Sequence, residues 1–113
     1  MTPFVAELIG TAMIITIGDG IVANVVLPQT KGNNGGLVAI VLGWAIAVFV
    51  GVYATADVSG AHLNPAVTIV MASARQIPNT EVLPYCLAEI LGGLVALEIY
   101  KRVKPPAMAT PMP

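Results

Sequence analysis

Three long stretches of the chain contain almost only apolar residues, and short polar stretches separate them. The clearest, residues 37–56 (LVAIVLGWAIAVFVGVYATA), has no charged side chain. As a helix rising about 1.5 Å per residue, it crosses a ~30 Å hydrocarbon core. Residues 4–27 and 82–100 are similarly long, although each contains carboxylates. Pro28 stops the first stretch, and residues 29–36 (QTKGNNGG) are typical of a solvated loop. The pattern therefore predicts an all-α membrane protein with three transmembrane helices.

The two ends of the chain differ in character. The first apolar stretch has no basic leader and is longer than the roughly 7–15 apolar residues of a signal peptide, so we expect it to be a retained helix. Residues 104–113 contain four prolines and no helical pattern. We predict a Pro-rich disordered tail for them.

Composition supports the membrane assignment and excludes several classes of protein. Hydrophobic residues make up 57% of the chain and charged residues 10%, whereas a soluble domain has about 25% charged residues. A mean hydropathy of +0.86 and a net charge of −1 exclude a soluble enzyme and a nucleic-acid binder. The single cysteine, Cys86, excludes an intramolecular disulfide, and His62 has no second His or multi-Cys set with which to bind a metal.

The segment between the second and third stretches lacks the pattern of a full membrane span. Residues 57–65 are small and polar, and residues 66–74 are apolar but give only about 13 Å of helix, roughly half a bilayer. Asn64 followed by Pro65 is a strong helix start, with Asn as N-cap and Pro as first helical residue. Two interpretations remain: a surface loop with an interfacial helix, or a re-entrant loop with a half-helix. Because non-helical backbone at membrane depth survives only where it lines a cavity or is buried in protein, the second implies a pore.

At these residues the sequence resembles a known family. SGAHLNPAVT (59–68) resembles the first signature of the aquaporin and glycerol-facilitator channels, AELIGT (6–11) resembles their first-helix motif, and GDGIVANVVL (18–27) is similar to the glycerol-channel branch. Family members are about twice as long and contain two inverted repeats, each with three spans and one half-helix. The resemblance implies that residues 1–103 form one such repeat, a half-channel whose re-entrant loop and half-helix occupy about residues 57–75.

The resemblance also implies a function. We expect a passive channel for small neutral solutes, above all glycerol and similar polyols, with water, in the cell membrane and without a cofactor. The resemblance further implies a tetramer with one pore per subunit. We expect this channel to be truncated or half-length. The alternative is a non-conducting structural or interaction half that needs a complementary second-half chain. A membrane enzyme is disfavoured because Ser59, Asp57, His62 and Cys86 form no spacing that assembles a nucleophile and a base.

By this resemblance the pore residues are one aromatic side chain and the residues of the signature, namely Trp44, Gly60, Ala61, His62, Leu63, Asn64, Pro65 and Ala66. Asn64 would donate its amide to a solute at the positive end of the half-helix, rather than act only as an N-cap. The extended stretch before it would turn carbonyls towards the pore, and the His62 ring would brace the loop. In glycerol-conducting members, a Trp at the position of Trp44 places its indole at the outer constriction. The alternative is that Trp44 faces lipid or the membrane interface.

Two carboxylates in the apolar stretches need partners. The resemblance implies that Glu7 braces the backbone of the re-entrant loop with hydrogen bonds, and we expect its natural partner to lie in the second repeat, which this chain lacks. Glu89 occupies a position where the family usually has Gln. We also expect that three spans cannot satisfy the loop backbone from Gly60 to Asn64 from within, which predicts an isolated chain that is unstable or does not conduct. Basic residues favour one orientation in the membrane (Lys31, Lys101, Arg102 and Lys104 inside), whereas the family topology favours the opposite one.

Overall fold

The computed structural model describes residues 1–103, so the predicted tail at 104–113 lies outside the described residues. The described part is helical throughout, with short connections. Its elements are α1 (Pro3–Val26), α2 (Gly36–Ser59), α3 (Pro65–Ser73), the 3-10 turn η1 (Asn79–Glu81) and α4 (Val82–Val103). Helices α1, α2 and α4 are long and apolar enough to cross a membrane. The predicted fold class, three transmembrane helices and one half-helix, is confirmed.

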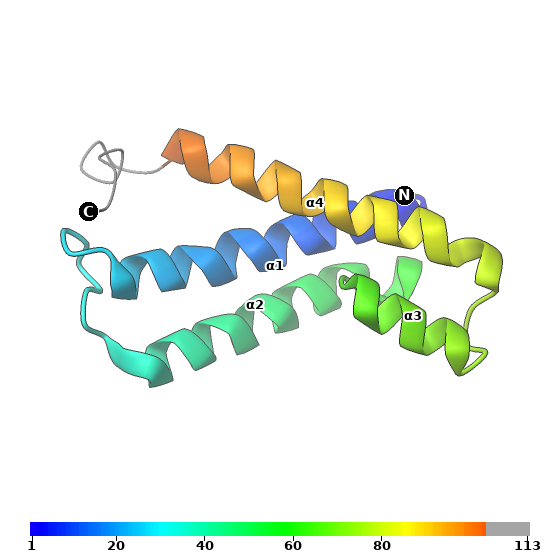
Figure 1. Ribbon diagram of the computed structural model, residues 1–113, viewed down its shortest axis with the longest axis horizontal. Coiled ribbons are helices and arrows are strands. Elements are labelled where there is room, and N and C mark those ends of the chain that lie inside the picture. The colour runs from blue at the N-terminus through cyan, green and yellow to red at the C-terminus, as the bar shows by residue number, and fades with distance from the viewer. Residues whose placement is uncertain (104–113) are drawn as a thin grey trace.

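Helix α1 is the centre of the arrangement (Figure 1). It packs against α2 on one side and α4 on the other, and the short α3 packs against α4. The described helices α1 and α4 run in the same direction and α2 runs antiparallel to them, while α3 starts near the middle of the molecule and ends where α4 begins. The molecule measures 46 × 26 × 24 Å, so its long axis is comparable to the full thickness of a bilayer.

The second helix is longer than the hydropathy pattern predicts. The predicted span of 37–56 is extended at its carboxyl end, because α2 continues to Ser59. Gly60 then takes the left-handed conformation (φ 84°), and its N–H donates to the Ala56 carbonyl. A left-handed glycine directly after a helix is a common terminator, since it satisfies a free carbonyl and redirects the chain. Polar Asp57 is therefore part of the helix and does not belong to the predicted loop.

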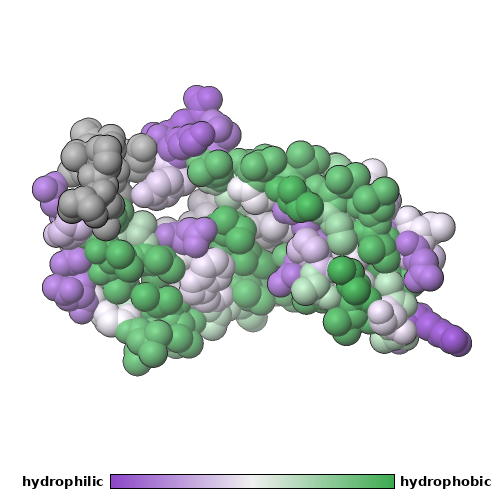
Figure 2. All heavy atoms as spheres, viewed as in Figure 1, coloured by the Kyte–Doolittle hydropathy of each residue, from purple (hydrophilic) through white to green (hydrophobic). Residues whose placement is uncertain are grey.

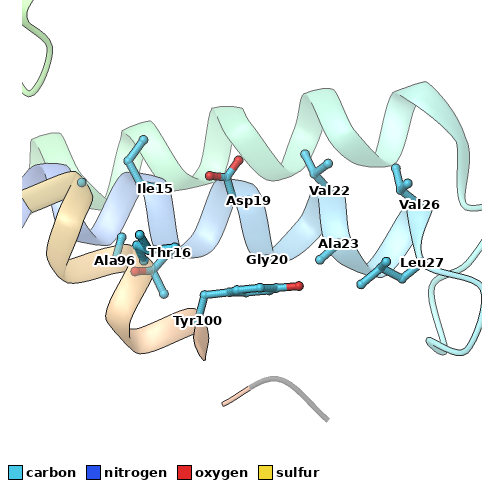
Figure 3. Close-up of a pocket in the computed structure, with 12 residues that line it drawn as sticks. Ile15, Thr16, Asp19, Gly20, Val22, Ala23, Val26, Leu27, Ala96 and Tyr100 are labelled. Carbon is cyan, nitrogen blue, oxygen red and sulfur yellow. The ribbon is translucent and has the colours of Figure 1, made fainter. Parts of the chain in front are cut away.

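The surface of the long helices is apolar. Large hydrophobic side chains such as Leu37, Phe49 and Leu83 are two-thirds or more exposed. Figure 2 shows hydrophobic residues over much of the visible face, with hydrophilic residues at both ends and a few between them. This distribution fits a surface that contacts lipid. Where α1 and α4 diverge they leave a groove of about 400 Å³, in which the Tyr100 ring extends along α1 (Figure 3).

Candidate pore loop and half-helix

The centre of the candidate site is the five-residue loop 60–64 together with the first turn of α3. Asn64 has extended backbone (φ −163°, ψ 125°), and its Oδ1 accepts from the Ala66 N–H at 2.8 Å. Pro65 is the first helical residue, where its missing N–H costs nothing. The predicted N-cap is confirmed. The cap uses only the oxygen of the amide, and among residues 1–103 the Asn64 Nδ2 has no protein acceptor.

Glu7 binds the loop from α1. Its Oε1 accepts from the His62 N–H at 3.0 Å and from the Ser59 hydroxyl at 2.6 Å, and its Oε2 accepts from the Leu63 N–H at 2.6 Å. The Ser59 hydroxyl oxygen in turn accepts from the Ala61 N–H at 3.1 Å. The side chain of Glu7 is fully buried. The expectation that the partner of Glu7 lies in a second repeat is wrong, because residues 52 to 56 positions later in this chain supply its partners.

A second buried carboxylate, Glu89 of α4, holds the start of the half-helix. Its Oε2 accepts from the Asn64 N–H at 3.2 Å, and the Thr68 hydroxyl lies 3.0 Å from Oε2 and 3.2 Å from Oε1. One turn earlier on the same face of α4, the Tyr85 hydroxyl donates to the Ser59 carbonyl at 2.8 Å. These contacts connect α4 to both ends of the loop, a role that sequence analysis did not assign to Glu89, Thr68 or Tyr85.

The two carboxylates hold a backbone that would otherwise relax. Ala61 and Leu63 have left-handed conformations (φ 52° and 55°), which cost an L-residue about 1–2 kcal/mol each. Turns of this kind make successive N–H groups converge on an anion. The carboxyl oxygens of Glu7 accept from the N–H groups of His62 and Leu63, and Glu89 accepts from the N–H of Asn64. Each of these hydrogen bonds contributes about 0.5–1.5 kcal/mol, which is comparable to the strain of one left-handed residue.

In the described part of the chain, the backbone N–H groups of the loop have hydrogen-bond partners, whereas most of its carbonyls do not. The N–H groups of residues 60–64 all donate to acceptors within the chain. The carbonyls of residues 60–63 accept no hydrogen bond from any part of the chain that the structure describes. The expectation that three spans cannot satisfy this loop from within is therefore wrong for its donors, since Glu7, Ser59 and Glu89 lie close enough to accept from them. The expectation is correct for the carbonyls of residues 60–63.

The predicted site residues of the loop and the start of α3 differ in burial. Gly60, Asn64 and Ala66 are exposed, Ala61 and Pro65 are half-buried, and His62 and Leu63 are buried. The His62 ring contacts other residues of the cluster: Nδ1 is 3.1 Å from the Thr68 hydroxyl, and the ring lies 4.9 Å from that of Tyr85.

Trp44 does not join this cluster. The Leu63 side chain lies at the level of Gly51 on α2, and Trp44 is seven residues earlier on that helix, about 10 Å along its axis. The half-buried indole rests there against Gly18 of α1. The structure thus places the predicted aromatic residue and the predicted loop at separate levels along the helices.

Replacement of Glu89 tests the second brace. Glu89→Leu removes the acceptor for the Asn64 N–H and the Thr68 hydroxyl, and we expect a loss of about 1–3 kcal/mol in the free energy of unfolding in detergent. Glu89→Gln keeps one acceptor oxygen and should lose less than half of that. Glu98→Leu is the matched control, because Glu98 lies on the same helix in an exposed pair with Lys101. Equal stability of Glu89→Leu and Glu98→Leu would exclude a brace at Glu89.

Fold and site define a class of protein: an integral membrane protein with three crossing helices and a carboxylate-braced re-entrant half-helix. The chain belongs to the major intrinsic protein family, whose sequence model matches residues 1–112.

Curated relatives carry channel names. A probable glycerol uptake facilitator protein of Thermotoga maritima is 45% identical over 106 residues, which cover 93% of this chain and 45% of the relative. Glycerol uptake facilitator protein 3 of Lactiplantibacillus plantarum is 51% identical over 89 residues, 79% of this chain and 37% of the relative. Aquaporin-7-2 of Laccaria bicolor is 42% identical over 94 residues, which cover 80% of this chain and 28% of the relative. The chain spans less than half the length of these relatives.

Proposed function

We propose that this chain forms one half of a passive channel in the cell membrane for small neutral solutes, namely glycerol and similar polyols together with water. The observation that carries the proposal is the one-sided hydrogen bonding of loop 60–64. Four consecutive carbonyls have no partner in the described part of the chain, and next to them the exposed Asn64 presents a free amide donor. Polar groups without hydrogen-bond partners cost free energy when they are buried or face lipid. A polar solute or water can supply the missing partners.

The arrangement suits a solute that both donates and accepts hydrogen bonds. Hydroxyl groups would donate to the carbonyls of residues 60–63 in turn and accept from the Asn64 amide. The amino-terminal end of α3 carries a partial positive charge, which disfavours cations and protons. The indole of Trp44 would supply an apolar surface for the carbon backbone of a polyol.

Further support comes from the relatives. Those from Thermotoga maritima and Lactiplantibacillus plantarum are named as glycerol uptake facilitators, and each is more than twice as long as the segment that matches. A pathway lined by residues 60–64 and Trp44 needs a second wall. We propose that an inverted second repeat supplies it, and that complete channels assemble as tetramers.

The test is to compare vesicles that contain residues 1–113 alone with complemented vesicles, which contain the chain together with the second repeat of the Thermotoga maritima relative. Light scattering after an osmotic jump measures both permeabilities. We expect glycerol and water to enter complemented vesicles at least about tenfold faster than protein-free ones, a barrier reduction of about 1.4 kcal/mol. Vesicles with the chain alone should match the protein-free ones. Fast water entry without glycerol entry would contradict the proposed permeant.

A further inference from the structure

Gly18 of α1 and Trp44 of α2 form a contact that the proposed pore did not require. A Cβ atom built on Gly18 would lie 2.6 Å from Cδ2 of the Trp44 indole and closer still to Cε3 and Cζ3. Real Cβ atoms essentially never approach other atoms within 3.0 Å. The indole therefore lies directly on the backbone of Gly18, at a depth that only glycine permits.

The contact with Gly18 covers one part of the Trp44 side chain. Trp44 is half-buried, so part of its ring remains uncovered by the rest of the described chain. An alanine at position 18 would force the ring to move by about 1 Å to reach ordinary van der Waals separation, since close-packed interiors do not absorb an added methyl group. The backbone of α1 lies on one side of the ring, so the free direction is away from α1, towards the uncovered side.

We propose that Gly18 is a positioning residue for solute selectivity: it lets the Trp44 indole lie back against α1 and so sets the width of the opening at that level. This inference rests on the proposed function in one respect, namely that the uncovered side of Trp44 faces the pathway. A glycerol molecule is wider than a water molecule, so a ring displaced into the opening obstructs glycerol more than water. Gly18 thereby acts on selectivity through Trp44 without touching the solute.

The chain offers a direct reporter and a matched control. Trp44 is the only tryptophan, so its emission and its quenching by acrylamide report the position of this one ring. Gly20 lies on the same helix two residues later, and a Cβ there would meet nothing within 4 Å. Gly20→Ala therefore reproduces the gain in helix propensity of a Gly→Ala change without the contact.

The experiment compares Gly18→Ala, Gly20→Ala and the unchanged chain. In vesicles with the chain alone, we expect acrylamide quenching of Trp44 to rise in Gly18→Ala and to stay unchanged in Gly20→Ala. In complemented vesicles, we expect the ratio of glycerol to water permeability to fall roughly tenfold in Gly18→Ala only, which corresponds to about 1.4 kcal/mol of added barrier for glycerol. Unchanged quenching would overturn the positioning role, and a displaced ring with an unchanged ratio would overturn its effect on selectivity.

A double-mutant cycle guards against simple misfolding of Gly18→Ala. If the added methyl group acts through the indole, Gly18→Ala should lower the unfolding midpoint in the original chain and lower it much less in the Trp44→Phe background, where the ring is smaller. Equal effects in both backgrounds would overturn the proposal. If the unchanged chain passes no glycerol in complemented vesicles, the proposed function and the selectivity role both fail. Quenching and the cycle still decide whether Gly18 positions the indole.

Discussion

Glu7→Ala is expected to destabilise the chain more than any other single replacement in the loop network. The change leaves the N–H groups of His62 and Leu63 and the hydroxyl of Ser59 without their acceptor in a buried site. Each buried donor that loses its only acceptor costs about 1–3 kcal/mol, so the loss of the acceptor for three donors should cost at least about 3 kcal/mol. The left-handed conformation of Leu63 would then lose the contact that holds it. We expect a large fall in the midpoint of unfolding in denaturing detergent, measured by circular dichroism.

A matched control lies one turn along the same helix. Thr11 is buried like Glu7, but its hydroxyl has no hydrogen-bond partner among residues 1–103. Thr11→Val therefore removes a buried polar atom without breaking a bond, and we expect it to be neutral or slightly stabilising. Glu7→Gln keeps one oxygen but directs an N–H₂ group at backbone donors, so it should fall between the two. A midpoint for Glu7→Ala equal to that of Thr11→Val would show that Glu7 does not hold the loop.

The elements of the fold could be predicted because each depends on neighbouring residues. Long apolar stretches between polar breaks indicate the spans, and Asn64 followed by Pro65 indicates the start of α3. The hydropathy pattern predicts an end of α2 that is three residues too early, because polar Asp57 resembles the start of a loop. The signal that decides the matter is Gly60, a left-handed cap directly after the helix.

The bracing of the loop could not be predicted in the same way. The bonds from Glu7 join residues 52 to 56 positions apart, and nothing in the local pattern shows which amides a distant carboxylate will meet. A carboxylate inside an apolar span does indicate a nearby polar partner, and Glu89 carries that signal as clearly as Glu7. The spacing of Tyr85 and Glu89, four residues apart, also places them on one face of α4. The partners themselves emerge only when the helices pack.

Asn64→Asp is expected to change permeation while leaving the fold intact. Asp and Asn are equally good N-caps, so the carboxylate can still accept from the Ala66 N–H. The replacement deletes the amide donor and sets a negative charge at the exposed start of α3. The lost hydrogen bond should lower glycerol permeability in complemented vesicles by up to about tenfold, since such a bond contributes about 0.5–1.5 kcal/mol.

The added charge acts on cations in the opposite sense. A cation about 4 Å from a carboxylate is attracted by about 4 kcal/mol at an effective dielectric constant of ~20, which allows up to roughly a thousandfold increase in entry. Proton and potassium leak into complemented vesicles, followed with pH- and potential-sensitive dyes, measures this. Asn79→Asp is the isosteric control, because Asn79 is exposed in η1 and lies outside the loop, so the same charge change there should leave both fluxes unaltered. If Asn64→Asp and Asn79→Asp behave alike in glycerol flux and in cation leak, Asn64 does not lie in the pathway, and its side chain serves only as the cap of α3.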